Sequence, residues 1–285
     1  MSAFFDHVRS EARQRVALFT GEGAYHGASK PKVNPTQSIS SEELAPTLEE
    51  YVRRGTNDFE TFSAMFPNRC DVVRQLVVPS QEQIRKDPVT FCWCPFTQAL
   101  EQAGPATGEV LAAMRSHLEG KKHHVYVDSK IQYFEAGDLP VDSCLWHIDG
   151  GIAVRDARAK ALGYSLLHDM RSRLCGSHSP PTYLAYQSSL HCATEFSTKP
   201  VTVMLPDCIP SFDLLNQRVR EVDPERIAQP AASIIRYDGL SLHRAVPAQS
   251  SGWRLWIRCV ETDREVVLED VVGPCYATVF RRQAG

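Results

Sequence analysis

The sequence has no long apolar run. No stretch of its 285 residues approaches the ~20 consecutive apolar residues that a helix needs to cross a bilayer. The opening segment, MSAFFDHVRSEARQRV, interrupts its apolar positions with charges too early for a secretory leader. These absences predict a cytoplasmic protein without a membrane partner.

An excess of positive charge is also missing. The chain has 31 Lys and Arg residues against 34 Asp and Glu residues, for a net charge of −3, whereas a nucleic-acid-binding domain usually shows a clear basic excess. No segment interleaves aromatic and basic residues in the manner of single-strand nucleic-acid grooves. Nucleic acid is therefore not the favoured partner, although a local basic patch is compatible with this composition.

The nine cysteines form no regular pattern. An odd number at irregular spacing, without a leader, is typical of free thiols in a reduced compartment. Cys92 and Cys94 lie two apart in FCWCP, but a zinc site usually needs a second such pair at a set spacing, and the sequence has none. We therefore interpret Cys92 and Cys94 as structural thiols.

Residues 1–122 are predicted to be largely helical. Apolar residues at helical spacing favour a helix within residues 6–19, and a capping-box pattern favours one within residues 40–55. A further helix is expected after Thr107, its predicted N-cap, with Gly120 as the stop signal. The chain has no internal repeat and no low-complexity tract.

From residue 123 the sequence changes to short β-rich runs. Examples are HHVYVD, KIQYFEAG, PVTVML and WRLWIRCVE, separated by turn-forming Gly, Pro, Asp and Ser. About eight such strands predict a jelly-roll core over residues 123–285, with residues 155–181 inserted between two strands. The expected fold class is mainly β with flanking helices, and residues 1–285 are expected to form a single domain.

The segment LWHIDGG contains a histidine and an aspartate two residues apart, His147 and Asp149, at the end of a predicted strand. Residues two apart on a strand point to the same face, so both side chains can reach one metal ion. His117 and Glu119 have the same spacing, but they lie in a predicted helix, where residues two apart diverge around the axis. His147 and Asp149 are therefore the candidate ligands.

A third candidate ligand, His243, lies much later in the chain, in the strand-like run LSLHRAV. Two histidines and one carboxylate form a facial triad, which leaves coordination positions open and suits non-haem Fe(II) oxygenases. The alternative for His243 is a hydrogen-bonded histidine of the core.

The run SGWRLWIRCVE places two arginines, Arg254 and Arg258, on one face of a predicted strand and apolar residues on the other. Arginines that face inward in an otherwise apolar strand are costly unless they meet an anion. A guanidinium group is suited to bidentate capture of a carboxylate. For one of the two arginines, the alternative is that it forms an internal salt bridge instead of binding an external carboxylate.

With these residues in this order, the sequence resembles the Fe(II)- and 2-oxoglutarate-dependent dioxygenase superfamily. The resemblance is carried by the run His147-Ile148-Asp149, the distal His243 and Arg254, and it covers residues 130–260. The stretches QYFEAGD and YDGLSLHRAVP support it. The resemblance implies a double-stranded β-helix, the jelly roll. It also implies that the triad binds Fe(II), that Arg254 holds the distal carboxylate of 2-oxoglutarate, and that O2 is the oxidant.

The implied reaction couples the decarboxylation of 2-oxoglutarate to the oxidation of a substrate C–H bond. Halogenases of this superfamily usually have a small residue where this sequence has Asp149, so hydroxylation or a related oxidation is favoured over halogenation. Demethylation, desaturation and ring closure use the same iron chemistry and stay open.

Three further residues are secondary candidates for the co-substrate pocket. Tyr133 lies in the strand before the ligand pair, where its hydroxyl could reach a carboxylate of 2-oxoglutarate, and a core tyrosine is the equal alternative. Thr194 is a candidate for lining this pocket, although a structural role is favoured. Arg258 is a candidate for a second carboxylate contact or for a substrate contact.

The predicted insertion follows the metal ligands directly and carries more basic than acidic residues. A basic wall at the mouth of the site would attract an anionic small molecule, such as a nucleotide or a carboxylate, and a solvated helix face is the alternative. Its basic residues are Arg155, Arg158, Lys160, Arg171 and Arg173.

We expect a small-molecule substrate, such as an amino acid or a natural-product intermediate. The second hypothesis is the same chemistry on a nucleic-acid base or a protein side chain. The third is a non-catalytic jelly-roll protein that binds a metal or another ligand. The sequence predicts no particular oligomeric state.

Overall fold

The computed structural model describes residues 60–141, 144–149, 168–177, 179–209, 212–266, 271–275 and 279. The helices predicted within residues 6–19 and 40–55 lie outside these ranges, as do residues 155–167 of the predicted insertion. Within the described ranges, no helix is long and apolar enough to cross a membrane.

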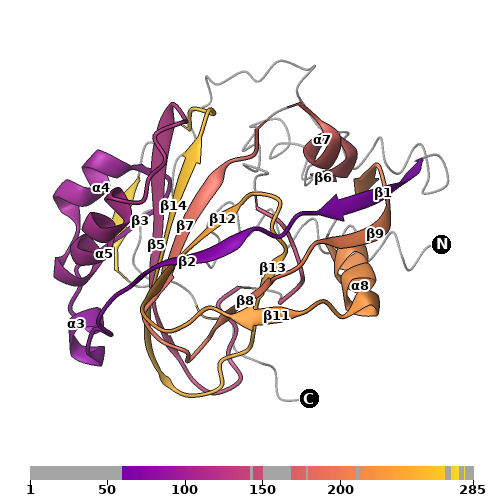
Figure 1. The fold of residues 1–285 in the computed structure, drawn as a ribbon. Helices are drawn as coiled ribbons and strands as arrows, with labels where there is room; N and C mark the ends of the chain where they lie inside the picture. The colour runs from indigo at the N-terminus through magenta and orange to yellow at the C-terminus, as the bar shows by residue number, and fades with distance from the viewer. Residues whose placement is uncertain are drawn as a thin grey trace, which may run out of the picture.

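The largest layer is a six-stranded sheet whose neighbouring strands are all antiparallel (Figure 1). The strands β5 and β14 pair along their whole length, and both are rich in the β-branched and aromatic residues that favour a pleated backbone. In spatial order the strands are β2 (Cys70–Gln75), β12 (Ser233–Asp238), β7 (Thr182–Gln187), β14 (Gly252–Thr262), β5 (His124–Phe134) and β4 (Cys94–Pro95).

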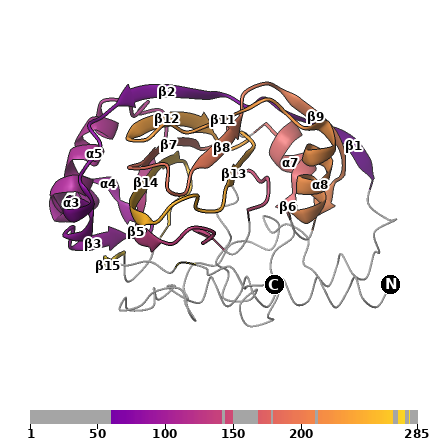
Figure 2. The ribbon, with the colours of Figure 1, turned by 90° about the horizontal axis from the view of Figure 1, so that it is seen from below.

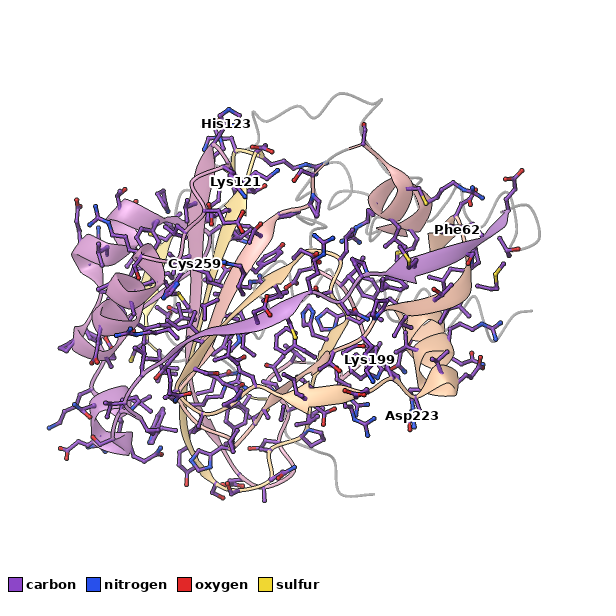
Figure 3. All side chains as sticks on the ribbon, in the orientation of Figure 1. Phe62, Lys121, His123, Lys199, Asp223 and Cys259 are labelled. Carbon is purple, nitrogen blue, oxygen red and sulfur yellow. The ribbon has the colours of Figure 1, made fainter. Side chains whose placement is uncertain are left out.

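Helices cover one face of this sheet (Figure 2). Alternate residues of β14, namely Leu255, Ile257 and Cys259, are fully buried in an apolar cluster with Leu111 and Met114. The Cys259 thiol lies 3.3 Å from the Met114 sulfur (Figure 3). The covering helices are α3 (Gln81–Arg85), α4 (Phe96–Gln102) and α5 (Pro105–Arg115).

Helix α5 begins at Pro105, so Thr107 is not its N-cap as predicted. Proline is favoured at the first helical position because its missing N–H needs no partner there. Asp87, outside the helix, accepts hydrogen bonds from the Thr107 backbone N–H at 2.8 Å and from its hydroxyl at 3.0 Å. The helix ends at Arg115, and Gly120 follows with a φ of +66°.

The part predicted to be largely helical also contains strands. Besides β2 and β4, residues 60–122 form β1 (Thr61–Phe66) and β3 (Val89–Phe91). Strand β1 alternates exposed and buried residues and pairs with β9 (Val201–Pro206). Alternation is the strand signal, but these strands are short and lie close to helix-favouring segments, and for that reason the sequence-based prediction misses them.

A three-stranded antiparallel sheet lies on the other side of the large sheet. In this smaller sheet β8 (Thr194–Ser197) lies between β11 (Arg226–Ala228) and β13 (His243–Ala245). Phe196 of β8 packs against Tyr183, Ile235 and Tyr237 of the large sheet, which joins the two layers. The remaining elements are β6 (His168–Asp169), β10 (Cys208–Ile209), β15 (Val272–Pro274), α7 (Met170–Cys175) and α8 (Asp213–Val222).

The prediction of a mainly β fold with flanking helices is confirmed. The jelly-roll topology and the single domain stay predictions. No disulfide joins the cysteines whose side chains the structure describes. Cys94 is buried, and its burial raises the pKa of its thiol to about 12, while Cys92 is partly buried.

Candidate metal centre

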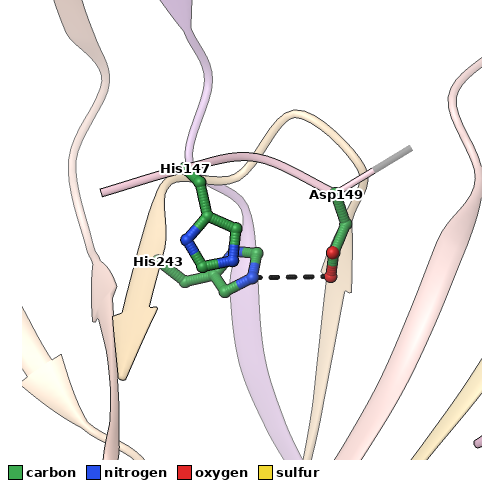
Figure 4. A group of neighbouring side chains, drawn as sticks. All are labelled: His147, Asp149 and His243. Carbon is green, nitrogen blue, oxygen red and sulfur yellow. Dashed lines mark ion pairs between the residues drawn. The ribbon is translucent and has the colours of Figure 1, made fainter. Parts of the chain in front are cut away.

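The structure brings His147, Asp149 and His243 together from distant parts of the chain (Figure 4). One potential ligand atom from each residue lies within 4.8 Å of the other two. His243 Nε2 is 3.4 Å from Asp149 Oδ2, and the two imidazole centroids are 4.3 Å apart. His243 is 6% exposed, and the other two residues are partly buried. This geometry can hold a metal ion.

Backbone pairing places the two histidines side by side. His147 and His243 form an isolated antiparallel bridge, in which each backbone N–H donates to the carbonyl of the other at 3.0 Å. The residue before His243 is anchored separately, because the Leu242 N–H donates to the side-chain oxygen of Asn68 at 2.8 Å. Asn68 has a φ of 52°, a left-handed conformation that asparagine tolerates better than most residues.

Carbonyl oxygens fix the orientation of both imidazole rings. His147 Nδ1 lies 2.8 Å from the Leu145 carbonyl oxygen, and His243 Nδ1 lies 2.9 Å from the Ser241 carbonyl oxygen. A carbonyl accepts but does not donate, so each Nδ1 carries the proton and each Nε2 keeps a free lone pair. Burial, followed by the neighbouring His243, lowers the pKa of His147 to about 4. Neutral imidazoles with oriented Nε2 atoms are the form that binds metals.

Asp149 is held by two hydrogen-bond donors. Arg258 Nη1 donates to its Oδ1 at 2.9 Å, and the Tyr237 hydroxyl donates to its Oδ2 at 2.7 Å. Burial alone would raise the pKa of this carboxyl group, but the charge of Arg258, the two neighbouring imidazoles and the hydrogen bond from Tyr237 outweigh burial and lower it. Asp149 is therefore a carboxylate, the ionisation state that a metal ligand needs.

Arg258 contacts a candidate ligand rather than an open pocket. Its second nitrogen, Nη2, donates to Asp128 Oδ2 at 3.0 Å, directly across the pairing of β14 with β5. The sequence predicted a carboxylate of the co-substrate or a contact to the substrate for this arginine. The carboxylates that it meets in the structure are its own chain's Asp128 and Asp149.

Arg254 lies on the same face of β14 as Arg258 and is 3% exposed. Its Nη1 donates to the Cys192 carbonyl oxygen, and its guanidinium carbon lies 5.4 Å from the Phe134 ring centroid. Its Nε has no hydrogen-bond partner, and no carboxylate of the described residues lies within ion-pair distance. Burial lowers the pKa of Arg254. A guanidinium in this situation lacks a counter-anion.

A third cation on this face, Lys130, was not among the predicted site residues. It lies opposite Trp256 in the β5–β14 register, and its ammonium nitrogen is 5.5 Å from the centroid of that ring. Burial, then the charges of Arg254 and Arg258, lower the pKa of Lys130 to about 8. The alternation in KIQYF, with Lys130 two residues before Gln132, is the sequence signal that could have revealed it.

Tyr133 does not belong to the site. It pairs with Trp253 on the face of β5 opposite to that of Lys130, and it is 41% exposed. Its ring contacts the Trp253 ring edge-on, with centroids 5.4 Å apart. Strand alternation places Tyr133 on the helix-covered face of the sheet, away from Lys130, and its exposure contradicts the alternative of a core tyrosine.

Thr194 is the first residue of β8 and shares a strand face with Phe196, whose ring stacks on His243 with centroids 5.5 Å apart. Its backbone N–H donates to the side-chain oxygen of Gln187 at 3.2 Å. This position is compatible with lining the site, and the hydrogen bond to Gln187 is structural.

Two basic residues of the predicted insertion lie within the described ranges. Arg173 Nη2 donates to the Asp149 backbone carbonyl at 2.9 Å, next to the metal centre. Arg171 instead forms ion pairs with Asp207 and Glu60. Arg155, Arg158 and Lys160 lie outside the described residues.

No family model matches this chain, and a comparison with curated proteins gives no match either. A solved structure that does match is titled "Crystal Structure of EvdMO1", with 13% identity and a TM-score of 0.28. The match covers 79% of this chain and 62% of that chain. A likeness at this level decides neither fold nor function, so the functional argument depends on the geometry of the site.

Proposed function

We propose that this protein is an Fe(II)- and 2-oxoglutarate-dependent oxygenase with a jelly-roll core, acting on a small-molecule substrate. The observation that carries the proposal is the convergence of His147, Asp149 and His243 within 4.8 Å. Two imidazoles and one carboxylate are the donor set of non-haem Fe(II) oxygenases, which leaves positions open for other ligands. When bound, the iron would supply the O2-dependent oxidation of a C–H bond, coupled to decarboxylation of 2-oxoglutarate to succinate and CO2.

The residues of the triad fit a metal ion without rearrangement of their hydrogen bonds. The Nδ1–H groups of both histidines already donate hydrogen bonds to backbone carbonyls, so the Nε2 atoms remain available to bind a metal ion through their lone pairs. Asp149 would add one carboxylate oxygen, in an orientation fixed by Arg258 and Tyr237. Outer hydrogen bonds of this kind orient metal ligands and raise affinity.

Arg254 supports the choice of 2-oxoglutarate as co-substrate. Its buried guanidinium has no carboxylate partner among the described residues, although burial of a charge without a counter-ion is unfavourable. The distal carboxylate of 2-oxoglutarate would provide that partner, and a guanidinium can bind it through two parallel hydrogen bonds. The Phe134 ring beside Arg254 would help to exclude water from this pair.

The charges around the centre favour an anionic small molecule as the substrate class. Lys130, Arg254 and Arg258 lie on one face of the large sheet, together with Asp128 and facing Asp149. These groups carry one net positive charge before any metal binds. A bound Fe(II) ion would add two positive charges, and bound 2-oxoglutarate would cancel two, so one net positive charge would remain. A positive potential of this kind attracts carboxylates and phosphates.

An anaerobic titration tests the proposal independently of the substrate. Addition of Fe(II) and then 2-oxoglutarate to the purified protein should produce the visible metal-to-ligand charge-transfer absorption of a 2-oxo acid chelated to ferrous iron. His243→Ala should abolish this absorption, since one of the three ligands is lost. His191→Ala is the matched control, because the His191 imidazole is bonded to Ser250 and is not part of the triad.

Admission of O2 to the same samples then tests turnover through the formation of succinate. Metal binding without the absorption band would favour a non-catalytic metal-binding protein over the oxygenase. A band that persists in His243→Ala would contradict the assignment of the triad.

A further inference from the structure

A continuous chain of hydrogen bonds leads from the turn before β4 to the candidate metal ligand Asp149. The Trp93 backbone N–H donates to Asp128 Oδ1 at 2.8 Å. Asp128 Oδ2 accepts from Arg258 Nη2 at 3.0 Å, and Arg258 Nη1 donates to Asp149 Oδ1 at 2.9 Å. This series of hydrogen bonds therefore links the Trp93 backbone to the Asp149 side chain through Asp128 and Arg258.

Asp128 and Arg258, the two inner groups of this hydrogen-bond series, are each held in place by more than one contact. Asp128 lies directly opposite Arg258 in the β5–β14 register, so the backbone pairing itself sets their separation. The Asp128 and Arg258 side chains are 14% and 19% exposed. Trp93, which supplies the first donor, has a φ of 49°, a strained conformation for a tryptophan. Strained residues of this kind cluster at functional sites.

The hydrogen bonds divide the two oxygens of Asp149 between different partners. Oδ1 accepts from Arg258, whereas Oδ2 accepts from Tyr237 and lies 3.4 Å from His243 Nε2. Oδ2 thus lies next to the His243 nitrogen that would bind the metal, and Oδ1 is turned toward the Arg258 guanidinium.

We propose that Arg258, anchored by Asp128, is a positioning residue that presents Oδ2 of Asp149 to the metal and withholds Oδ1. This inference rests on the proposed function, because it requires a metal ion at the triad. It assigns Arg258 to the metal ligand, and it leaves the capture of the co-substrate to Arg254.

The opposite role for Arg258 makes an opposite prediction. A guanidinium whose only effect was its positive charge would repel the metal ion, so its removal would tighten metal binding. A positioning residue orients the ligand, so its removal should weaken metal binding, by roughly 10-fold for an outer-shell partner. The sign of the change in affinity therefore separates the two roles.

The test measures the affinity of the full chain for Mn(II) without 2-oxoglutarate, so that it does not depend on the co-substrate. Arg258→Gln alone would leave Asp128 as a buried unpaired charge and endanger the fold, so the main variant is the double substitution Asp128→Asn with Arg258→Gln. We expect this variant to bind Mn(II) roughly 10-fold more weakly than the wild type and to change the electron paramagnetic resonance spectrum of the bound ion. Arg258→Lys, which keeps one charged donor, should recover part of the affinity.

Arg236→Gln is the matched control. Arg236 is a partly buried arginine of the same sheet whose guanidinium donates to the His117 carbonyl at 2.6 Å and contacts no triad residue. It should leave both affinity and spectrum unchanged. Equal or tighter Mn(II) binding by the double variant, with a wild-type spectrum, would overturn the positioning role alone. Absence of Mn(II) binding by the wild-type protein would overturn this inference and the metal centre together.

Discussion

The two faces of the six-stranded sheet differ in what their side chains contribute. On the face covered by helices, Leu255, Ile257 and Cys259 of β14 are fully buried in an apolar cluster. The opposite face carries Arg254 and Arg258, and Arg258 donates a hydrogen bond to Asp149 of the candidate metal centre. One strand thus supplies both the core and the site, because successive residues point to opposite sides.

The difference between the faces is energetic. Burial of apolar side chains contributes about 25 cal/mol per Å² of surface removed from water, whereas burial of charges is repaid only when their partners are in place. Asp128 and Asp149 are such partners for Arg258, but no described carboxylate is one for Arg254. The helix-covered face therefore stabilises the fold. The site face is less stabilising, because it buries a cation, Arg254, whose counter-ion would come from a bound ligand.

Two adjacent substitutions in β14 should separate these contributions most strongly. Leu255→Ala, on the helix-covered face, should lower the free energy of unfolding by about 2–5 kcal/mol through loss of burial and formation of a cavity. Arg254→Met, on the site face, should leave stability unchanged or raise it by about 1 kcal/mol, since an unpaired buried charge is removed. The same variant should weaken 2-oxoglutarate binding by roughly 30-fold or more.

Denaturant unfolding of the apo protein and calorimetric titration with 2-oxoglutarate in the presence of Mn(II) measure the two effects. The Mn(II) affinity of folded Leu255→Ala serves as the control, and it should equal that of the wild type. If Arg254→Met destabilised the protein as much as Leu255→Ala, the guanidinium would be a structural group and the contrast between the faces would fail.

A second test uses the charge of Lys130. Its pKa of about 8 in the folded protein lies below the ordinary lysine value of 10.5, with burial as the main cause. Between these two pH values the unfolded chain binds more protons than the folded chain, so this group makes stability rise with pH, by up to about 1.4 kcal/mol per pH unit. Lys130→Met lacks this contribution.

The variant Lys130→Met should therefore be more stable than the wild type at pH 7, and its advantage should shrink as the pH rises from 8 to 10.5. Comparing the two proteins cancels the titration of the cysteines and tyrosines, which the two share. The measurement is the difference in unfolding free energy, from denaturant curves at a series of pH values. A difference that stays constant across this range would mean that Lys130 is not a charged group buried at the site.

The triad could be predicted from the sequence because its signal is local. His147 and Asp149 are two apart in a strand-like run, and His243 follows a turn in a second such run. The alternation in β14 likewise predicted that its two arginines and its apolar residues lie on opposite faces. Both predictions require only the period of a strand, which sequence carries directly.

The partners of these residues depend on the register between strands, which the sequence does not specify. Asp128 meets Arg258 because β5 and β14 pair in one particular alignment. Tyr237 begins the stretch that leads to His243, but it reaches Asp149, a residue far from it in the sequence, from β12. The face on which Tyr133 lies could not be predicted for the same reason, since alternation in β5 has two possible phases and only the pairing with β14 decides between them.

The smallest expected effects come from two glycines on the helix-covered side, and their signs should be opposite. Gly120 has a φ of +66°, and a methyl group added there would meet nothing within 4 Å, so Gly120→Ala should cost about 1 kcal/mol from backbone strain alone. Gly108 lies within α5, and a methyl group there would meet only Ala103 at an ordinary 3.7 Å.

Gly108→Ala should therefore stabilise the protein by about 0.5–1 kcal/mol, because alanine restricts the unfolded chain and favours the helix. Thermal or denaturant unfolding measures both changes. Because neither glycine contacts the triad, both variants should bind Mn(II) as the wild type does. A shift in Mn(II) affinity in either variant would mean that the helix-covered side influences the metal centre. Stability and metal binding would then not be assigned to separate faces of the sheet.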